Sequence, residues 1–515
     1  MQAAKQQYRA QILQKKKKKM PLPHAVLITY PTAGQLNPML QLAQLLHSQG
    51  FYITFVNTEF GYRQLLRGNA SLDALFGRFN RSSFRFVSIP DGICESDLQG
   101  PGYLLNVWFS IVRNCPAALH ELLLELNSSP DVPRLTCIIT NFLVTFPRDV
   151  ADRLGVPELV FWTTSACGLM ASLHVRELVR RGYVPLKDES CLTNGYLDTA
   201  IDWIPGMKDI RLRDISSFIR TTDRDDFYLK EEMEEADYAL KSQGLILNTF
   251  EGMEGEVLDA LRGFFPRIYA LGAIGSLIDQ ISGSAATTTP MRLGSWDEEE
   301  EEDRRCAEWL EAQQRGSVVY VSFGSITTLT RDELAEFAWG LAESGRPFLW
   351  VVRPGLVEGG IEALPGGLVE ETKGRSLLVK WCHQGKVLSH PAIGVFLTHG
   401  GWNSMMESVA RGVPMICWPG FADQYTNCRY ACKHWGFGME IEEEVRRGQV
   451  TEVVREALEG EKGEEMRKKA MEWKEKARRA AAEDGTSFTD LARLANDLTQ
   501  LTTNTGIKQT KHTPS

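Results

Sequence analysis

Short apolar runs alternate with helical patterns in two separate parts of the chain. In the first part, HAVLITYP (His24 to Pro31) and FYITFVN (Phe51 to Asn57) are apolar runs that predict buried strands. Between them, apolar residues at helical spacing predict a helix with Asn37 as its N-cap and Pro38 as its first residue. This β-α-β unit is typical of a parallel sheet covered by helices on both faces.

The same pattern starts again after a polar break. The Ser/Ala/Thr-rich stretch from Ser282 to Thr289 and the acidic run from Asp297 to Asp303 indicate an exposed, solvated linker. Strands are then predicted at Ser317–Ser322 and Pro347–Arg353, with a helix between them. We therefore expect an α/β fold of two Rossmann-like β/α/β domains that face each other across a ligand-binding cleft.

Changes in composition set the expected domain boundaries. From the N-terminus, the expected parts are a disordered extension (1–20), an N-terminal domain (21–270), a linker (271–303), a C-terminal domain (304–480), a C-terminal helix (481–499) and a disordered tail (500–515).

Bulk composition narrows the class of protein. Of the 515 residues, 43% are hydrophobic and 24% charged, which is ordinary for a globular protein. The net charge of -9 argues against nucleic acid as the main partner, because phosphate binding needs a basic surface. We find no apolar run long enough to span a membrane, and no secretory signal. The ten cysteines show no C-x-x-C spacing, which favours free thiols and a cytoplasmic location.

One turn carries candidate binding chemistry. A strand predicted at Ile393–Thr398 runs into His399-Gly400-Gly401, followed by a helix that begins near Trp402. Two glycines let the backbone approach a ligand, and a helix N-terminus offers unpaired N–H groups, so the turn suits a diphosphate. The chain has neither G-x-G-x-x-G nor a Walker A motif, which disfavours a dehydrogenase or a kinase.

The segment around this turn, from Trp381 to Gln424, reads WCHQGKVLSHPAIGVFLTHGGWNSMMESVARGVPMICWPGFADQ. It resembles the signature of plant family 1 UDP-glycosyltransferases, without insertion or deletion. The resemblance spans Pro21 to Leu498 and is closest to the subgroup of iridoid, cyanohydrin and cytokinin glucosyltransferases. Other segments similar to the family are TEFGYRQLLR (58–67), VPELVFWTTSACG (156–168), DWIPGMKDIRLRD (202–214), SFGSIT (322–327) and EGEKGEEMRKKAMEWKEKA (459–477).

The resemblance implies a GT-B fold, with the acceptor bound by the N-terminal domain, the UDP-sugar by the C-terminal domain, and the last helix crossing back onto the N-terminal domain. It also implies roles in the donor site. Trp381 would stack on uracil, the Cys382 backbone would pair with the uracil edge, and Glu407 would bind the ribose hydroxyls. The residues that would hold the phosphates are His399, Asn403, Ser404 and Ser325. The residues that would complete the UDP-sugar site are Thr163, Gln384, Trp402, Asp423 and Gln424.

Within the signature, three positions depart from the family pattern. They are His383, Gly400 and Gly420, where proline, cysteine and an aromatic residue are usual. Glutamine at position 424 usually accompanies UDP-glucose as the donor in this family.

The two catalytic positions are also substituted. In the family, a histidine in G-H-x-N-P removes the proton of the acceptor hydroxyl, and an aspartate orients the imidazole. Here Gln35 stands at the histidine position and Asn141 at the aspartate position. Glutamine cannot act as a base near neutral pH, and a positioned base contributes about 10²–10⁴-fold in rate.

Two functions therefore stay open. The first is a UDP-glucose-dependent inverting O-glycosyltransferase that acts on a small lipophilic secondary metabolite; an acidic acceptor, such as a carboxylate or a phenolate, would not need the dyad. The alternative is a catalytically impaired pseudoenzyme that keeps UDP-sugar binding. A bacterial-type epimerase or glycogen synthase is disfavoured by the complete signature.

Further expectations follow from the resemblance. UDP-glucose would be a co-substrate, so we expect no bound cofactor and no metal. The partners would be UDP-glucose and the acceptor, bound by a monomer. Segments 92–107 and 175–196 are expected to shape the acceptor pocket.

Overall fold

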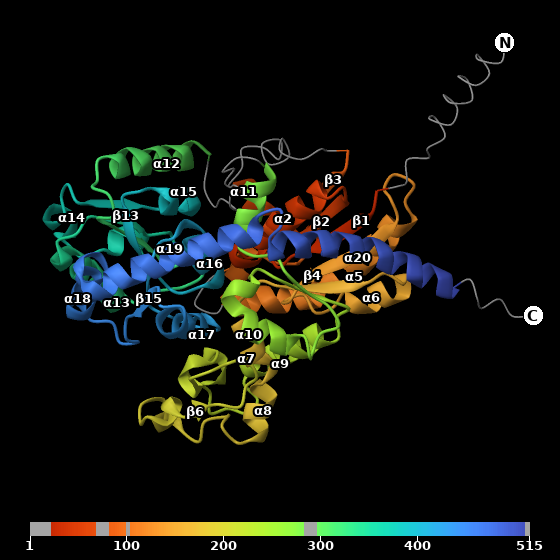
Figure 1. Ribbon diagram of the computed structural model, residues 1–515, viewed down its shortest axis with the longest axis horizontal. Helices are drawn as coiled ribbons and strands as arrows, with labels where there is room; N and C mark the ends of the chain where they lie inside the picture. Colours follow the sequence, from red (N-terminus) through yellow and green to blue (C-terminus); the bar gives the residue numbers. More distant parts are fainter. Residues whose placement is uncertain (1–21, 68–81, 99–102, 283–295, 510–515) are drawn as a thin grey trace, which may run out of the picture.

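Two parallel β-sheets, one in each half of the chain, form the centre of the molecule (Figure 1). The computed structural model describes residues 22–67, 82–98, 103–282 and 296–509. The N-terminal sheet has seven strands in the order β3-β2-β1-β4-β5-β8-β9, and the C-terminal sheet has six in the order β12-β11-β10-β13-β14-β15. In both sheets the chain adds strands on one side of the first strand and then returns to add strands on the other. This is the Rossmann order, so the predicted fold class is confirmed.

The strands predicted from apolar runs are all present, with ends shifted by a few residues. The strands of the N-terminal sheet are β1 (His24–Ile28), β2 (Tyr52–Thr58), β3 (Phe84–Ile89), β4 (Leu135–Asn141), β5 (Glu158–Trp162), β8 (Leu245–Leu247) and β9 (Ile268–Ala270). Those of the C-terminal sheet are β10 (Val318–Ser322), β11 (Phe348–Val351), β12 (Ser376–Val379), β13 (Ile393–Thr398), β14 (Met415–Cys417) and β15 (Gly438–Glu440). A separate antiparallel pair is formed by β6 (Ala200–Ile201) and β7 (Ile210–Arg211).

Helices cover both sheets. Those of the N-terminal half are α2 (Ala33–Ser48), α3 (Glu59–Arg67), α5 (Tyr103–Ser128), α6 (Arg148–Leu154), α7 (Ala166–Leu173), α8 (Val175–Arg180), α9 (Phe227–Leu240), α10 (Glu251–Leu261) and α11 (Ile274–Ser282). Those of the C-terminal half are α12 (Trp296–Glu311), α13 (Arg331–Ser344), α14 (Leu368–Glu371), α15 (Gln384–Ser389), α16 (Trp402–Arg411), α17 (Gln424–Arg429), α18 (Arg447–Glu459), α19 (Glu461–Ala481) and α20 (Thr486–Gln509).

The start of α2 differs from the prediction. The helix begins at Ala33 with Thr32 as its N-cap, so the prediction of Asn37 as N-cap was wrong, and Pro38 lies inside the helix. Proline has no N–H, so the carbonyl of Gly34, four residues earlier, lacks its helical donor. The side chain of Asn403, on α16 of the other domain, donates to that carbonyl at 2.6 Å. Because Pro38 lacks an N–H, the Gly34 carbonyl stays free to accept the hydrogen bond from Asn403 that links the two domains.

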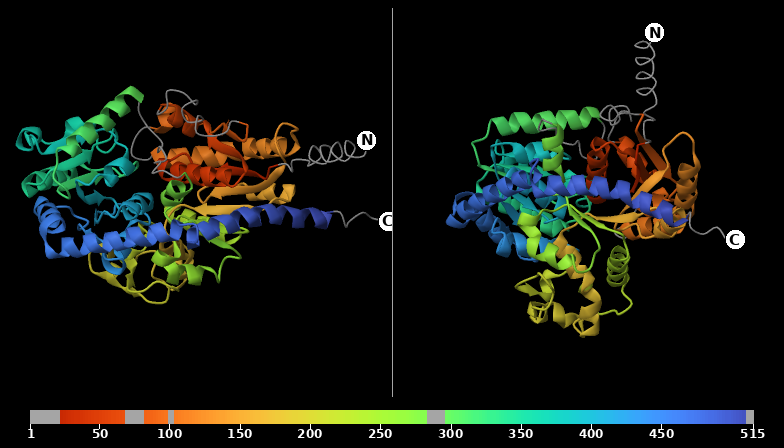
Figure 2. Two further views of the ribbon diagram at one scale, coloured as in Figure 1. Left: turned by 45° about the horizontal axis from the view of Figure 1, so that its top comes forward. Right: turned by 45° about the vertical axis from the view of Figure 1, so that its right-hand side comes forward.

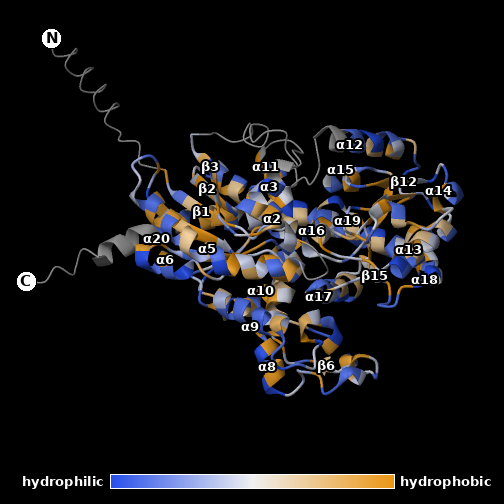
Figure 3. Cartoon of the chain, turned by 180° about the vertical axis from the view of Figure 1, so that it is seen from behind, coloured by the Kyte–Doolittle hydropathy of each residue, from blue (hydrophilic) through white to orange (hydrophobic). Residues whose placement is uncertain are grey.

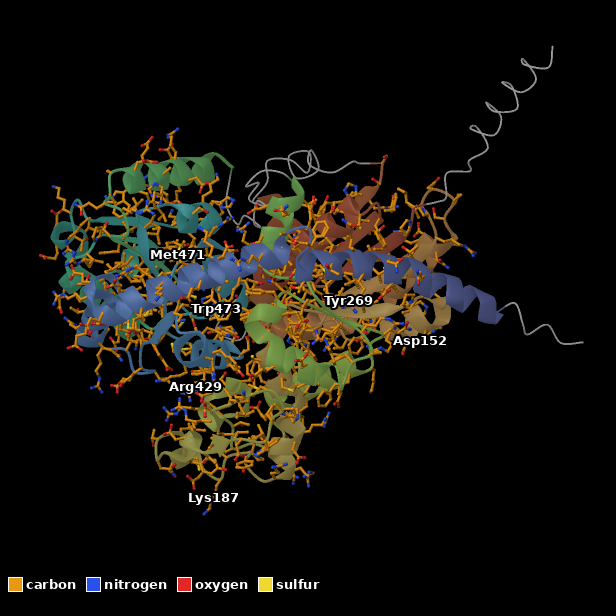
Figure 4. The ribbon with its side chains drawn as sticks, viewed as in Figure 1. Asp152, Lys187, Tyr269, Arg429, Met471 and Trp473 are labelled. Carbon is orange, nitrogen blue, oxygen red and sulfur yellow. The ribbon has the colours of Figure 1, made fainter. Side chains whose placement is uncertain are left out.

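The last helix crosses between the domains. α19 packs in the C-terminal half, and α20 runs along the N-terminal sheet, as both views in Figure 2 show. Its buried Leu491, Leu494 and Leu498 belong to the same apolar cluster as residues of β1, β2 and β5. The Tyr269 hydroxyl, labelled beside α20 in Figure 4, donates to Asp497 at 2.8 Å. α20 therefore packs on the sheet of the N-terminal half.

Part of the expected linker is helical. α11 packs into the N-terminal core through Ile274, Leu277 and Ile278, and the acidic run lies on α12. α12 is mostly hydrophilic in colour, whereas the strands of the N-terminal sheet are mostly hydrophobic (Figure 3). The extension expected over 1–20 lies outside the described residues, and α20 continues to Gln509 where a disordered tail was expected from 500.

Two expectations about the whole chain can be compared with the structure. All ten cysteines are free thiols, as expected. Within the described ranges, no helix has the length and apolarity needed to cross a bilayer.

Candidate active site

A cavity of about 1650 Å³ lies between the two domains. Its wall contains the loops that follow β1 and β5 of one sheet and β10, β13 and β14 of the other, where the carboxyl ends of parallel strands bring ligand-binding groups together. All residues predicted for the site line this cavity except Asn141, which is fully buried behind it. The predicted site residues therefore share one cavity, although side-chain geometry changes several of the expected contacts.

The two substituted catalytic positions contact each other. The Asn141 amide nitrogen donates to Gln35 Oε1 at 3.0 Å and lies 3.3 Å from Thr163 Oγ1. The Leu143 backbone N–H donates to Asn141 Oδ1 at 3.2 Å, which fixes the Asn141 amide with its nitrogen toward Gln35. The Thr163 hydroxyl also donates to Gln35 Oε1. Gln35 therefore presents its Nε2 group to a ligand, and that group can only donate a hydrogen bond.

The turn predicted to bind a diphosphate connects β13 to α16. β13 ends at Thr398, Gly400 has a φ of 77° that glycine adopts without strain, and Gly401 is the N-cap of α16. No side chain caps this helix, so the N–H groups of its first turn are open to a ligand. Burial lowers the pKa of His399 to about 4, and the positive charge of Arg353 acts in the same direction. His399 is therefore a neutral hydrogen-bonding group at physiological pH.

The group expected to bind ribose is held by a glutamine. Gln384 donates through Nε2 to Glu407 Oε2 at 2.9 Å and to Ser404 Oγ at 3.1 Å. Burial raises the pKa of Glu407, and the bond from Gln384 opposes that shift. The Tyr320 hydroxyl donates to Gln384 Oε1, which fixes the orientation of this amide. The Cys382 side chain points toward the same Tyr320 hydroxyl, which leaves its backbone for the expected uracil contact.

The side chains expected to bind the sugar hydroxyls already form hydrogen bonds within the protein. Gln424 Oε1 accepts from the Gly420 and Phe421 backbone N–H groups, at 2.9 and 3.2 Å. The Trp402 indole N–H donates to the Asn248 carbonyl at 2.9 Å, so it is not available to a sugar. Burial raises the pKa of Asp423 to about 6, while its Oδ2 accepts from an asparagine amide. A Cβ at Gly420 would meet only ordinary contacts, so the glycine leaves space where the family has an aromatic ring.

The acidic run is not merely solvated, which corrects the expectation for 297–303. Glu302 on α12 accepts from the backbone N–H groups of Lys380 and Trp381, at 3.0 and 2.9 Å. Asp303 accepts from the His383 N–H at 2.8 Å. The reason is local: the loop from β12 to α15 exposes successive N–H groups, and carboxylates on the adjacent helix satisfy them. His383 in turn caps α15 through its ring nitrogen.

Sequence reasoning missed several residues of the cavity. Segment 103–105 contributes as expected, but no described residue of 175–196 lines the wall. Instead, the wall is formed in part by two serines and three carboxylates of α9: Ser172, Ser216, Glu231, Glu232 and Glu235. The only sequence signal was the acidic run KEEMEE between apolar positions, which does not show which face of the helix turns inward.

Comparison with known proteins agrees with this site. The family model described as "UDP-glucoronosyl and UDP-glucosyl transferase" matches residues 297–473. The 7-deoxyloganetin glucosyltransferase of Catharanthus roseus is 46% identical over 92% of this chain and 96% of its own length. The (R)-mandelonitrile beta-glucosyltransferase of Prunus dulcis is 47% identical over 90% and 95%. The crystal structure of Os79 from O. sativa in complex with UDP superposes with a TM-score of 0.75 at 25% identity, covering 92% of this chain and 100% of that one. With such identity over nearly its whole length, the chain belongs to the plant family 1 UDP-glycosyltransferases.

Proposed function

We propose that this protein is a UDP-glucose-dependent glucosyltransferase that transfers glucose, with inversion at the anomeric carbon, to an oxygen of a small lipophilic acceptor. The single observation that carries the proposal is the continuous cavity that joins the diphosphate turn at His399 to the Gln35 position. The donor-site residues and the acceptor-facing residues therefore share one space, as group transfer between two bound substrates requires. The glucosyltransferases that the chain resembles support the same reaction.

The donor side supplies the binding chemistry. UDP would lie with its diphosphate on the open N-terminus of α16, which stabilises negative charge as the bond from C1 of glucose to the phosphate oxygen breaks. Asn403 is already bonded to the Gly34 carbonyl, so the same turn also holds the two domains together. Trp381 and Glu407 would fix the uridine part.

The acceptor side lacks the usual base. The acceptor oxygen attacks C1, UDP leaves, and the proton of the acceptor must go to another group or to solvent. Gln35 Nε2 can donate a hydrogen bond to that oxygen but cannot take its proton. The proposal therefore favours acceptors that ionise readily, such as phenols, because a phenolate needs no base.

The test is UDP release from UDP-glucose with a panel of phenols, carboxylic acids and alcohols. Wild type is compared with the double variant Gln35→His, Asn141→Asp, which restores the family dyad. We expect the wild type to react with phenols and the double variant to gain about 10²–10⁴-fold on alcohols. If the wild type releases no UDP with any acceptor yet binds UDP-glucose, while the double variant turns over, the pseudoenzyme alternative holds and the proposal is wrong.

A further inference from the structure

Three carboxylates of α9 face the acceptor side of the cavity. Glu231, Glu232 and Glu235 all line it, and Glu235 lies about one turn after the other two on α9. Like charges at these spacings destabilise a helix. A local conflict of this kind is expected where a side chain serves a ligand rather than the fold.

The three carboxylates have no cation beside them in the described part of the chain. None of them forms an ion pair, and Lys230, their neighbour on α9, pairs with Asp225 instead. The only charged groups that shift the pKa of any of the three are other carboxylates. The cavity's arginines are engaged elsewhere: Arg353 donates to backbone carbonyls of the C-terminal domain, and Arg411 pairs with Asp279.

Glu232 has an unpartnered oxygen. Glu232 is only 6% exposed, and Oε1 accepts from the Ser172 hydroxyl at 2.8 Å. The Ser216 hydroxyl also stabilises the ionised carboxyl and lowers its pKa, while Oε2 has no partner of normal hydrogen-bond geometry among the described residues. A buried carboxylate oxygen without a partner is costly, because water no longer solvates it. On a cavity wall, such an atom can accept a hydrogen bond from a ligand.

Aromatic rings surround the same end of the cavity. Trp108 and Phe227 lie edge to face with centroids 4.8 Å apart, and Phe218 stacks on Tyr228 at 5.1 Å. All four line the cavity, as does Tyr30. Burial raises the pKa of the Tyr30 phenol, and the charge of Glu235 acts in the same direction. Aromatic faces together with uncompensated carboxylates form the environment that organic cations prefer.

We propose that the acceptor carries a protonated amine, which the carboxylates of Glu231, Glu232 and Glu235 hold against the aromatic wall. The inference rests on the proposed function only because it identifies the bound amine as the acceptor. A phenol that bears an ammonium group suits both groups of residues. Its phenol oxygen needs no base at Gln35, and its ammonium group neutralises the α9 carboxylates. A carboxylic acid acceptor would meet like charge at the same wall.

The test is calorimetric binding to the UDP-saturated protein, with three probes of one shape. Tyramine carries the ammonium, 4-ethylphenol lacks it, and 3-(4-hydroxyphenyl)propionate replaces it by a carboxylate. We expect tyramine to bind about tenfold or more tightly than 4-ethylphenol, and the propionate to bind most weakly. Burial raises the pKa of Glu231 and of Glu232 to about 7, so binding of a cation should also release protons, measured as a dependence of the heat on buffer ionisation.

Variants of α9 test whether these carboxylates cause the preference for tyramine. Glu232→Gln and Glu235→Gln should each bring tyramine to within about twofold of 4-ethylphenol, and Glu232→Gln should also lower the proton release, because it removes one of the two groups that titrate near pH 7. Glu234→Gln, on the exposed side of the helix, should leave the preference for tyramine unchanged. UDP affinity and the thermal midpoint check that each variant is folded, and Glu231→Gln replaces Glu232→Gln if the latter is not.

Two results would overturn the proposal. One is equal binding of tyramine and 4-ethylphenol, or binding of neither. The other is a tyramine affinity that the variants leave unchanged while they lower turnover of 4-ethylphenol, since the carboxylates would then act on the proton. Because these are binding measurements, they stay informative even if no acceptor releases UDP, which is the outcome that contradicts the proposed function.

Discussion

At the scale of single residues, backbone groups decide how the side chains of the site are oriented. Asn141 turns its nitrogen to Gln35 because its oxygen accepts from the Leu143 N–H. The sequence predicted both positions, since a motif fixes which residue stands where. It could not predict that Thr163, directly after the neighbouring strand β5, would donate to the same oxygen, because that contact depends on the register between β4 and β5.

We expect the ring of Trp381 to provide most of the recognition of the uracil base. It lines the cavity, and its backbone is fixed by Glu302. We expect Trp381→Ala to weaken UDP binding by about 1–3 kcal/mol, the usual worth of stacking a base on an aromatic ring, as measured by calorimetry. Trp381→Phe should keep most of the affinity. Equal affinity of the alanine variant and the wild type would mean that uracil does not stack here.

Glu232 predicts a pH-dependent stability. Burial raises its pKa from 4.5 to about 7. Below pH 4.5 the carboxyl is protonated in both the folded and the unfolded state, so it does not affect the free energy of unfolding. As pH rises from 4.5 to 7 the unfolded state ionises first, and the folded state loses up to about 3 kcal/mol from this group.

Removal of this carboxyl should reverse that loss. The thermal midpoint of Glu232→Gln, relative to wild type, should therefore increase between pH 5 and pH 8, as followed by calorimetry without ligand. The matched variant Glu234→Gln should show no such trend, because Glu234 is exposed. A difference between Glu232→Gln and wild type that stays constant with pH would show that Glu232 ionises normally.

At the scale of elements, α12 shows how a helix from outside the signature holds a loop of the predicted donor site. Its carboxylates accept from the backbone of the loop that carries Trp381. The sequence showed an acidic run but not its partners, because charged residues on a surface helix look the same whether they meet water or a neighbouring loop. Strands were easier to predict than this helix, since a buried strand is apolar along its whole length.

Glu302→Ala should consequently weaken UDP binding by about tenfold. The loop would lose two hydrogen bonds to a charged acceptor, each worth about 1.5–3 kcal/mol, and only part of that loss reaches the ligand. The measurement is UDP affinity by calorimetry, with Glu308→Ala as the control on the exposed side of α12. If both variants bind UDP equally well, the loop holds its shape without Glu302.

At the scale of the whole molecule, the stability of the N-terminal domain depends on α20, the helix that follows the C-terminal domain in sequence. α20 follows the C-terminal domain in sequence, yet its Leu494 is fully buried in the apolar cluster of the N-terminal sheet. Asp490 and Asp497 add hydrogen bonds to the backbone of Ala270 and the hydroxyl of Tyr269. The apolar stripe on α20 could be predicted from sequence, whereas its two polar contacts needed the position of β9.

Leu494→Ala tests this coupling, because Leu494 is buried in the apolar cluster of the N-terminal sheet and does not line the cavity. A buried leucine cut to alanine costs about 2–5 kcal/mol, which for a domain of this size lowers the thermal midpoint by several degrees. UDP affinity at 20 °C should stay unchanged, since the turn at His399 and the loop that carries Trp381 belong to the other domain. Leu124→Ala, at an exposed leucine of α5, is the control and should shift the midpoint little. If Leu494→Ala instead lowered UDP affinity without a change in midpoint, α20 would act on the orientation of the domains and not on the stability of the N-terminal one.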